Sequence, residues 1–327
     1  MPSELTMTAD SDRQGRPETA TISVIIPTRN GAATLRELLA ALRIQTRYPD
    51  EILVIDSASD DDSIAVAREY GAVVHRIAAE DFDHGATRSL GATMTHGDVL
   101  VYFTQDVLPA DRNMIEKLVE PLLRHHDIGM SYGRQLPAFG ADELAAHLRR
   151  FNYPPDPVVR EFADREHVGL AAIFASNSCA AYRRSVLAGI GFFPAGLIFG
   201  EDTWVAGRLL MNGHKIAYAA DATVYHSHNQ SREDEFRRYF DIGVLHETEN
   251  WLLTTYGGTG GRGMRYLKSG IISLGSRRSY SALAEFMVRV ALKWVGYQLG
   301  RRFRLLPRSM AIRLSLNRNW WHRRALD

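Results

Sequence analysis

Short apolar runs alternate with helix-like segments through the first hundred residues of this chain. Runs rich in strand-forming residues lie at 21–26, 52–55, 73–77 and 99–103. Between them, apolar side chains recur at helical spacing in 33–44, 63–70 and 87–95. Strands that alternate with helices form a parallel sheet with right-handed crossover connections. The pattern therefore predicts an α/β fold for this part of the chain.

Beyond residue 110 the pattern is less regular. Helical spacing predicts helices at 113–124, 142–150, 201–211 and 232–251. Runs rich in strand formers predict strands at 128–135, 173–182, 215–219 and 223–226. The glycine-rich segment 256–263 is the best candidate for a linker. We therefore expect a disordered leader at 1–20, a catalytic domain at 21–256 and a basic helical region at 257–327.

Three features bear on the compartment. The N-terminus is polar and lacks the basic and apolar stretches of a signal peptide. No apolar stretch reaches the roughly 18 residues that a membrane-spanning helix needs. The single cysteine, Cys179, excludes an internal disulfide and is best explained as a small buried side chain. Together these features predict a cytoplasmic protein.

The net charge of +1 conceals an uneven distribution. Residues 257–327 carry 15 Lys and Arg against two acids, whereas residues 1–256 carry 24 against 36. Within the basic region, segment 281–306 has apolar residues at helical spacing with basic residues among them, which is typical of a helix on an anionic membrane surface. A helix packed on the catalytic domain or on a second subunit explains it equally well. Nucleic-acid binding is not expected, since no binding motif accompanies the charge.

Polar residues follow three of the predicted parallel strands, where ligands of open α/β sheets bind. Pro27, Thr28 and Arg29 follow the first strand, and Arg29 with nearby backbone N–H groups suits a diphosphate, although an ordinary turn is the alternative. Asp56 follows the second strand, where an acid commonly contacts a nucleoside. Asp106 follows the fourth strand, where a carboxylate can hold a divalent cation against a diphosphate.

Two common nucleotide-binding motifs are missing. The turn after the first strand lacks G-x-G-x-x-G, and the chain lacks G-x-x-x-x-G-K-[ST]. These absences argue against a dinucleotide-dependent oxidoreductase and a P-loop nucleotide hydrolase.

Two further groups carry potential chemistry. Glu201 and Asp202 begin a predicted helix, where acids either stabilise the helix dipole or supply a general base. His226 and His228 lie two apart in a predicted strand, so their side chains face the same side and can approach one metal ion. Half-buried histidines with ordinary hydrogen bonds are the alternative.

The order of these motifs resembles family 2 glycosyltransferases with the GT-A fold. The resemblance rests on residues 23–30, residues 54–60, the acid after the fourth strand and Gly200-Glu201-Asp202. Bacterial rhamnosyltransferases are the more specific likeness. It is carried by the segments 82–88, 103–106, 225–229, 238–244 and 293–300. The resemblance covers roughly residues 21–325.

This resemblance implies a GT-A fold, a mostly parallel sheet with flanking helices, and roles for individual residues. Asp202 is implied as the general base with Glu201 beside it, and Asp106 and His226 as ligands of Mg²⁺ or Mn²⁺. The implied substrate-binding residues are Pro27, Thr28, Arg29, Asp56, Asp83, Arg88, Gln105 and Trp204. Of these, Asp56 would contact a thymine or uracil base. One departure is Thr104, where the wider family often has an acid.

We therefore expect an inverting, metal-dependent glycosyltransferase. Its expected donor is dTDP-L-rhamnose, or another dTDP- or UDP-sugar, and its acceptor a lipid-linked or cell-envelope glycan at the inner face of the membrane. A homo-oligomer is possible. A sugar nucleotidyltransferase is disfavoured, because the turn at 27–31 lacks a glycine-rich basic loop. A non-catalytic glycan- or membrane-binding relative with a degenerate metal site remains the other alternative.

Overall fold

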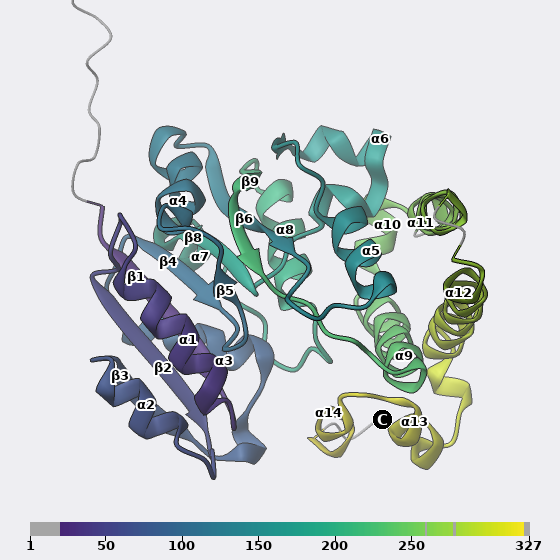
Figure 1. Ribbon diagram of the computed structural model, residues 1–327, viewed down its shortest axis with the longest axis horizontal. Helices are drawn as coiled ribbons and strands as arrows, with labels where there is room; N and C mark the ends of the chain where they lie inside the picture. Colours follow the sequence, from purple (N-terminus) through teal and green to yellow (C-terminus); the bar gives the residue numbers. More distant parts are fainter. Residues whose placement is uncertain (1–19, 259, 277–278, 324–327) are drawn as a thin grey trace, which may run out of the picture.

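A single mixed sheet crosses the molecule and is covered by helices on both faces (Figure 1). The computed structural model describes residues 20–258, 260–276 and 279–323, so the predicted leader lies outside the described residues apart from Ala20. Within the described residues the sheet has nine strands. Their bounds are β1 (Ile22–Thr28), β2 (Glu51–Ser57), β3 (Val73–Ile77), β4 (Val99–Phe103), β5 (Leu108–Pro109), β6 (Ile128–Leu136), β7 (Val158–Arg160), β8 (Cys179–Arg183) and β9 (Lys215–Tyr225).

The strand order is β3-β2-β1-β4-β8-β6-β9-β5, with β7 paired to β9. Strands β3, β2, β1 and β4 are parallel neighbours, as the alternating pattern predicts. Strand β8 runs antiparallel to both β4 and β6, and β6 runs parallel to β9. The reversed strand β8 therefore brings its amino end to the edge where β4 has its carboxyl end.

The described helices flank this sheet. Their bounds are α1 (Ala32–Arg43), α2 (Ser63–Glu69), α3 (His84–Met94), α4 (Met114–Arg124), α5 (Glu143–Asn152), α6 (Arg165–Val168), α7 (Arg184–Gly189), α8 (Glu201–Met211), α9 (Arg232–Thr248), α10 (Trp251–Tyr256), α11 (Gly260–Ser276), α12 (Tyr280–Gly300), α13 (Arg308–Leu314) and α14 (Arg318–Arg323). Helix α3 begins three residues before the predicted position.

Two apolar cores lie on opposite faces of the sheet. Ile22, Val24 and Ile26 of β1 pack with the apolar sides of α1, α2 and α4. Ile25, between them in the strand, belongs to the second core with residues of α3 and α8. A strand covered on both faces has to be apolar at successive positions. This is why the first strand is visible in the sequence as a continuous apolar run.

The predicted strand at 173–182 is wrong in its first half. Residues Gly169–Ile173 form a 3₁₀ helix, residues 174–178 form a loop, and β8 begins only at Cys179. Loop 174–178 continues an apolar run but contains polar residues at 176–178, and the side chains of Ser176 and Asn177 hydrogen-bond to groups distant in the sequence. Those contacts, described below, are tertiary and leave no periodic signal.

Four other predicted segments differ in their bounds. The predicted strands at 215–219 and 223–226 are one strand, β9, whose pairing with β6 shifts register between Gly133 and Arg134. The predicted helix at 232–251 corresponds to α9, which ends at Thr248, and α10 begins at Trp251. The linker predicted at 256–263 is mostly helical, since α11 begins at Gly260. The basic helix predicted at 281–306 corresponds to α12, which ends at Gly300.

Helix α12 packs closely on α9 (Figure 1). A Cβ atom at Gly300 would lie 2.0 Å from the backbone oxygen of Phe240, and one at Gly243 would lie 2.4 Å from that of Tyr297. Glycine therefore permits the two backbones to approach at these points. The buried Lys293 of α12 also pairs with Glu235 of α9 at 3.3 Å. The basic region is thus attached to the catalytic part through α12.

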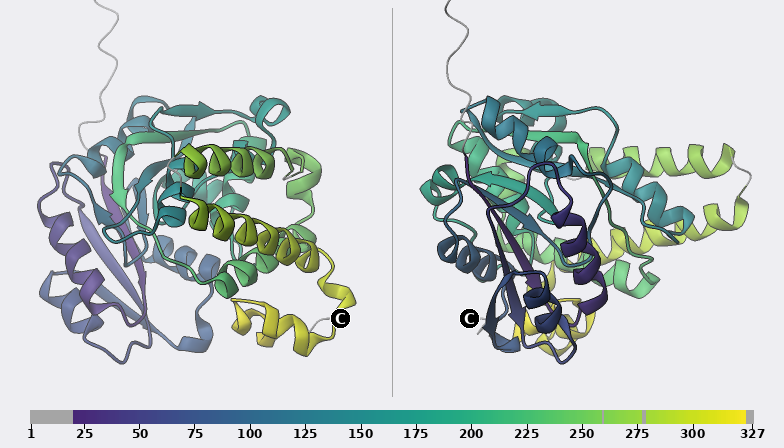
Figure 2. Two further views of the ribbon diagram at one scale, coloured as in Figure 1. Left: turned by 45° about the vertical axis from the view of Figure 1, so that its right-hand side comes forward. Right: turned by 60° about the vertical axis from the view of Figure 1, so that its left-hand side comes forward.

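Helices α11 and α12 form a hairpin that projects from the rest of the molecule (Figure 2, right). Its surface carries large exposed apolar side chains, including Ile272 and Trp294. None of the helices in the described ranges combines the length and the apolarity that crossing a membrane requires.

Candidate active site

Sheet pairing brings the predicted site residues to one edge. Thr28 at the end of β1 pairs with Asp56 at the end of β2, and Phe103 at the end of β4 pairs with Cys179 at the start of β8. The carboxyl ends of β1, β2 and β4 thus meet the loop that precedes β8. Ligands of open α/β sheets bind at such an edge.

Asp56 is fully buried at the end of β2. Its Oδ2 accepts a hydrogen bond from Ser59 N at 3.1 Å, and Arg76 Nε lies 3.9 Å away. Its Oδ1 is buried and has no hydrogen-bond partner among the described residues. An unpaired buried acceptor is costly, so this oxygen is suited to an N–H donor from a ligand.

Gln105 holds the turn that follows β1. Its Oε1 accepts from Arg29 N at 2.8 Å, and its Nε2 donates to Arg29 O at 3.0 Å. The amide lies so close to Gly31 that a Cβ atom there would come within 2.4 Å of it. Both polar groups of Gln105 therefore position the Pro27–Gly31 turn. Arg29 itself is exposed at this edge, while Thr28 is buried.

Asp106, His226 and His228 form a cluster of three possible metal ligands. Nε2 of His226 lies 3.4 Å from Asp106 Oδ2, and Nε2 of His228 lies 3.0 Å from the same oxygen. Asp106 is partly exposed and His228 is exposed, whereas His226 is buried. One ligand atom from each residue falls within 4.8 Å of the others, which is close enough for one ion to contact all three.

The buried His226 is oriented from behind by Gln135. Nδ1 of His226 lies 3.0 Å from Gln135 Oε1, which also accepts from Arg149 Nη1 at 2.5 Å. The amide is held in this orientation because Gln135 Nε2 donates to Ser176 Oγ at 3.0 Å. An acceptor opposite Nδ1 places the imidazole proton there and leaves Nε2 as the ligand atom.

Burial and the neighbouring imidazoles act oppositely on the acid of this cluster. Burial raises the pKa of Asp106, but the adjacent His226 and His228 outweigh it and hold that pKa well below its ordinary value. The pKa of His226 is lowered, mainly by burial. An ionised carboxylate beside a neutral imidazole is the protonation state that metal binding requires.

Glu201 and Arg88 form a buried ion pair on the other side of the site. Arg88 Nη1 lies 3.1 Å from Glu201 Oε1, and both side chains are almost entirely buried. Asn177 Nδ2 also donates to Glu201 Oε1 at 3.0 Å. Burial raises the pKa of Glu201, but the charge of Arg88 reverses this, so the pKa of Glu201 lies below its ordinary value. Arg88 Nε has no hydrogen-bond partner in the described part of the chain.

Asp202 has a different environment from its neighbour. It is partly exposed, its Oδ2 accepts from Asn177 N at 3.2 Å, and its Oδ1 accepts from Thr203 N at 2.7 Å. Burial, together with the negative charge of Glu201, raises the pKa of Asp202 to about 6. Adjacent carboxyl groups whose pKa values are driven apart are typical of acid–base sites. Asp202 is therefore the better suited of the two to accept a proton near neutral pH.

Asp83 and Trp204 lie in structural contacts. Asp83 caps α3 by accepting from Gly85 N at 3.0 Å and Ala86 N at 2.8 Å, and its second oxygen accepts from Gly196 N at 3.0 Å. The indole Nε1 of Trp204 donates to Glu249 Oε2 at 3.2 Å. A substrate contact of either residue stays a prediction.

The loop at 174–178 joins the two halves of the site. Ser176 accepts from Gln135, which orients His226, while the next residue, Asn177, donates to both Glu201 and Asp202. Sequence reasoning missed Gln135, Ser176 and Asn177. The only signal was that polar residues interrupt an otherwise strand-like run at 176–178.

Comparison of the chain with known proteins agrees with the fold and with the site. The model of the family described as glycosyl transferase family 2 matches residues 23–191, and the chain belongs to this family. It is therefore a nucleotide-sugar-dependent glycosyltransferase, as the sequence predicted.

Two similar relatives are named rhamnosyltransferases. The O-antigen chain rhamnosyltransferase RfbN of Salmonella typhimurium is 39% identical over 92% of this chain and 96% of its own length. The O-antigen chain rhamnosyltransferase WbaN of Salmonella anatum is 37% identical over 92% and 95%, respectively. At this coverage both likenesses reach into the basic C-terminal region.

Solved structures confirm the predicted GT-A fold. A mannosyltransferase from Pyrobaculum calidifontis, in complex with GDP-Man and Mn²⁺, matches with a TM-score of 0.54 at 16% identity, over 86% of this chain and 90% of that one. Glucosyl-3-phosphoglycerate synthase from Mycobacterium tuberculosis, in complex with Mn²⁺ and UDP, matches with a TM-score of 0.50 at 21% identity, over 73% and 81%.

Replacing Gln135 tests whether the support behind His226 matters for metal binding. We expect Gln135→Ala to weaken Mn²⁺ binding roughly 10- to 100-fold, because His226 loses the partner that fixes its tautomer and ring orientation. Electron paramagnetic resonance of free Mn²⁺ during a titration measures the affinity. Gln45→Ala removes an equally buried glutamine that contacts Ala41 and Asp111 instead, and should leave the affinity unchanged. Equal affinities in both variants would exclude this role of Gln135.

Proposed function

We propose that this chain is an inverting, metal-dependent rhamnosyltransferase that moves L-rhamnose from dTDP-L-rhamnose to a hydroxyl of a lipid-linked cell-envelope glycan. The observation that carries the chemistry is the pair of acids at the start of α8. Glu201 forms an ion pair with Arg88, whereas the neighbouring Asp202 has a raised pKa. The names of the two Salmonella relatives support the sugar and the kind of acceptor.

The nucleotide end of the donor fits the edge beside β1 and β2. The unpartnered Asp56 Oδ1 is suited to accept from the ring N–H that thymine and uracil share. Arg29, exposed on the turn that Gln105 fixes, is suited to the diphosphate. Pro27 and Thr28 shape the wall between these two positions.

The cluster of Asp106, His226 and His228 fits a divalent cation. The three donors converge, and Gln135 leaves Nε2 of His226 as a ligand atom. Two imidazoles suit Mn²⁺ better than Mg²⁺, which prefers oxygen ligands. Thr104 stands where the wider family often has an acid, and the two histidines supply the further donors. A cation bound here would stabilise the charge that develops on the departing diphosphate.

Asp202 completes the proposed chemistry as general base. The acceptor hydroxyl attacks the anomeric carbon of rhamnose as the bond to the diphosphate oxygen breaks, and Asp202 takes the hydroxyl proton. Asn177 and Thr203 hold its carboxylate in place. A single direct displacement inverts the anomeric configuration. Arg88 lowers the pKa of Glu201 and engages its carboxylate, so Glu201 is the weaker base of the two.

Donor turnover tests the proposed function directly. Purified protein with Mn²⁺ is expected to hydrolyse or transfer from dTDP-L-rhamnose in preference to other dTDP- and UDP-sugars, measured by release of nucleoside diphosphate. Asp202→Asn should bind the donor normally but lose roughly 10²- to 10⁴-fold in rate, as for other general bases. Absence of turnover with every sugar would favour the non-catalytic alternative. Release of diphosphate from dTTP and a sugar 1-phosphate would favour a nucleotidyltransferase.

The pH dependence of the rate tests the assignment of the base. Asp202 must be ionised to accept a proton, and its pKa is raised to about 6. We therefore expect kcat/KM to rise about tenfold per pH unit below pH 6 and to level off above pH 7. Asp202→Asn should abolish this dependence in the residual activity. A wild-type profile that is flat from pH 5 to pH 8 would contradict the assignment.

The hairpin of α11 and α12 supports a contact with the inner face of the membrane, where lipid-linked acceptors are accessible. Its exposed surface combines the apolar side chains of Met264, Ile271 and Ile272 with the basic side chains of Arg265 and Lys268. Apolar groups next to basic ones suit the interface of an anionic bilayer.

Vesicle flotation distinguishes the membrane from a second protein subunit. We expect the protein to float with vesicles that contain phosphatidylglycerol but not with pure phosphatidylcholine, and Ile272→Asp to reduce the bound fraction severalfold, because it places a charge in the apolar contact. Ile44→Asp, at an exposed apolar position on the opposite end of the chain, should bind as the wild type does. A dimer in solution that Ile272→Asp dissociates, without vesicle binding, would show that a second copy covers the hairpin.

A further inference from the structure

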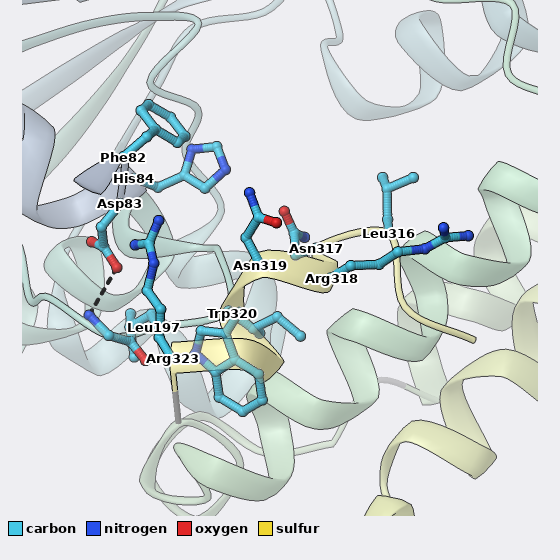
Figure 3. Close-up of a pocket in the computed structure, with 12 residues that line it drawn as sticks. Phe82, Asp83, His84, Leu197, Leu316, Asn317, Arg318, Asn319, Trp320 and Arg323 are labelled. Carbon is cyan, nitrogen blue, oxygen red and sulfur yellow. Dashed lines mark hydrogen bonds between the residues drawn. The ribbon is translucent and has the colours of Figure 1, made fainter. Parts of the chain in front are cut away.

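A pocket of about 520 Å³ lies between the start of α3 and the C-terminal segment (Figure 3). One side is the start of α3 with Phe82 and His84, the floor is the loop at 196–198, and the opposite wall is the segment 316–323. The side chains of Asn317 and Asn319 point from that wall toward His84 (Figure 3). The volume falls within the roughly 300–1,000 Å³ typical of small-molecule sites.

The wall formed by the C-terminal segment is firmly held. The buried Asp241 of α9 accepts from Ser315 Oγ at 2.6 Å, Leu316 N at 3.0 Å, Asn317 N at 3.1 Å and Asn317 Nδ2 at 2.9 Å. Trp320 Nε1 donates to Gly196 O at 2.7 Å, which ties the wall to the floor. The pocket is therefore a built feature, defined by hydrogen bonds between segments distant in the sequence.

The same contacts connect the pocket to the catalytic carboxylates. Loop 196–198 leads directly through Gly200 into Glu201 and Asp202. On the other side, the backbone oxygen of His84 accepts from Arg88 Nη1, the guanidinium nitrogen that pairs with Glu201. The pocket is thus connected to the proposed base through the loop that leads into α8 and through the pair of Arg88 and Glu201.

The lining has the chemistry of a saccharide site. Asn319 and the guanidinium group of Arg323 offer hydrogen-bonding groups at the pocket surface, and Phe82 offers an apolar face. Asn317 donates to Asp241, so its amide oxygen is oriented as an acceptor for the pocket. The one carboxylate in the lining, Asp83, has both oxygens engaged by backbone N–H groups. Neighbouring hydroxyls on a sugar ring match such a set of fixed donors and acceptors.

We propose that this pocket binds the terminal sugar units of the acceptor glycan and presents one hydroxyl to Asp202. The proposal rests on the transferase function proposed above and adds the location of the acceptor subsite. It assigns to the segment 316–323 a direct role in acceptor recognition, with Asn319 and Arg323 as the side chains that contact the sugar. Their exposure means that their replacement leaves the fold intact.

Saccharide binding without donor tests this subsite. The probes are methyl glycosides and disaccharides of L-rhamnose, D-galactose, D-mannose and D-glucose, and saturation-transfer difference NMR detects binding to the full-length protein. We expect at least one probe to bind, and Asn319→Ala and Arg323→Ala each to weaken that binding about tenfold, as the loss of a hydrogen bond to a bound ligand does. Arg313→Ala is the matched control, since Arg313 is exposed on α13 outside the pocket, and it should bind as the wild type does.

Several results would overturn the proposal. These are wild-type affinity in both pocket variants, absence of binding of every probe, or binding of inorganic diphosphate that displaces the sugar and is lost in Arg323→Ala, which would identify an anion site. Because the measurement needs no donor, it is independent of the nucleotide-sugar assay. Sugar binding in a protein without donor turnover would place the failure in the proposed reaction, whereas turnover without sugar binding would place it in this subsite.

Discussion

The buried ion pair between Arg88 and Glu201 is the interaction on which the rest of the site depends. It joins α3 to the start of α8 with almost no exposure to water. Loss of one partner would leave an isolated charge in the interior, at a cost of roughly 3–5 kcal/mol. The pair keeps Glu201 ionised, and this charge in turn disfavours ionisation of Asp202. Asn177, held between the two carboxylates, fixes the loop that extends to Ser176 and the metal cluster.

The strand ends could be predicted from sequence because a strand buried on both faces is a continuous apolar run, and the run stops where the strand ends. Ile22 to Ile26 are apolar at nearly every position since each face of β1 has its own core, and the first polar residues therefore mark the site edge. The same logic located Asp56 and Asp106. Glu201 and Asp202 are recognisable at a helix start, but the difference between them is not, because it depends on Arg88, more than a hundred residues away in the sequence.

What could not be predicted depends on contacts without periodicity. The run at 173–182 is strand-like at both ends, yet Ser176 and Asn177 within it form a loop whose partners lie on β6 and α8. A substrate contact of Gln105 stays a prediction, whereas the two hydrogen bonds of its amide to the Arg29 backbone left no signal in the sequence. Less of the positive charge near the C-terminus is unpaired than the sequence suggests, because Arg289, Lys293 and Arg301 form ion pairs with acids of α9.

The way the proposed acceptor pocket is built has a consequence for how such an enzyme changes its specificity. Its floor is fixed to the start of α3, since Asp83 bonds to Gly196 and a Cβ at Gly85 would collide with the backbone of Pro194. The opposite wall is anchored to Asp241 through two backbone N–H groups and the side chains of Ser315 and Asn317, so Asn319 is not needed to hold it. The framework therefore tolerates exchange of the residues that meet the sugar. Point substitutions in the segment 316–323 would therefore change which acceptor binds, while the positions of Glu201 and Asp202 stay the same.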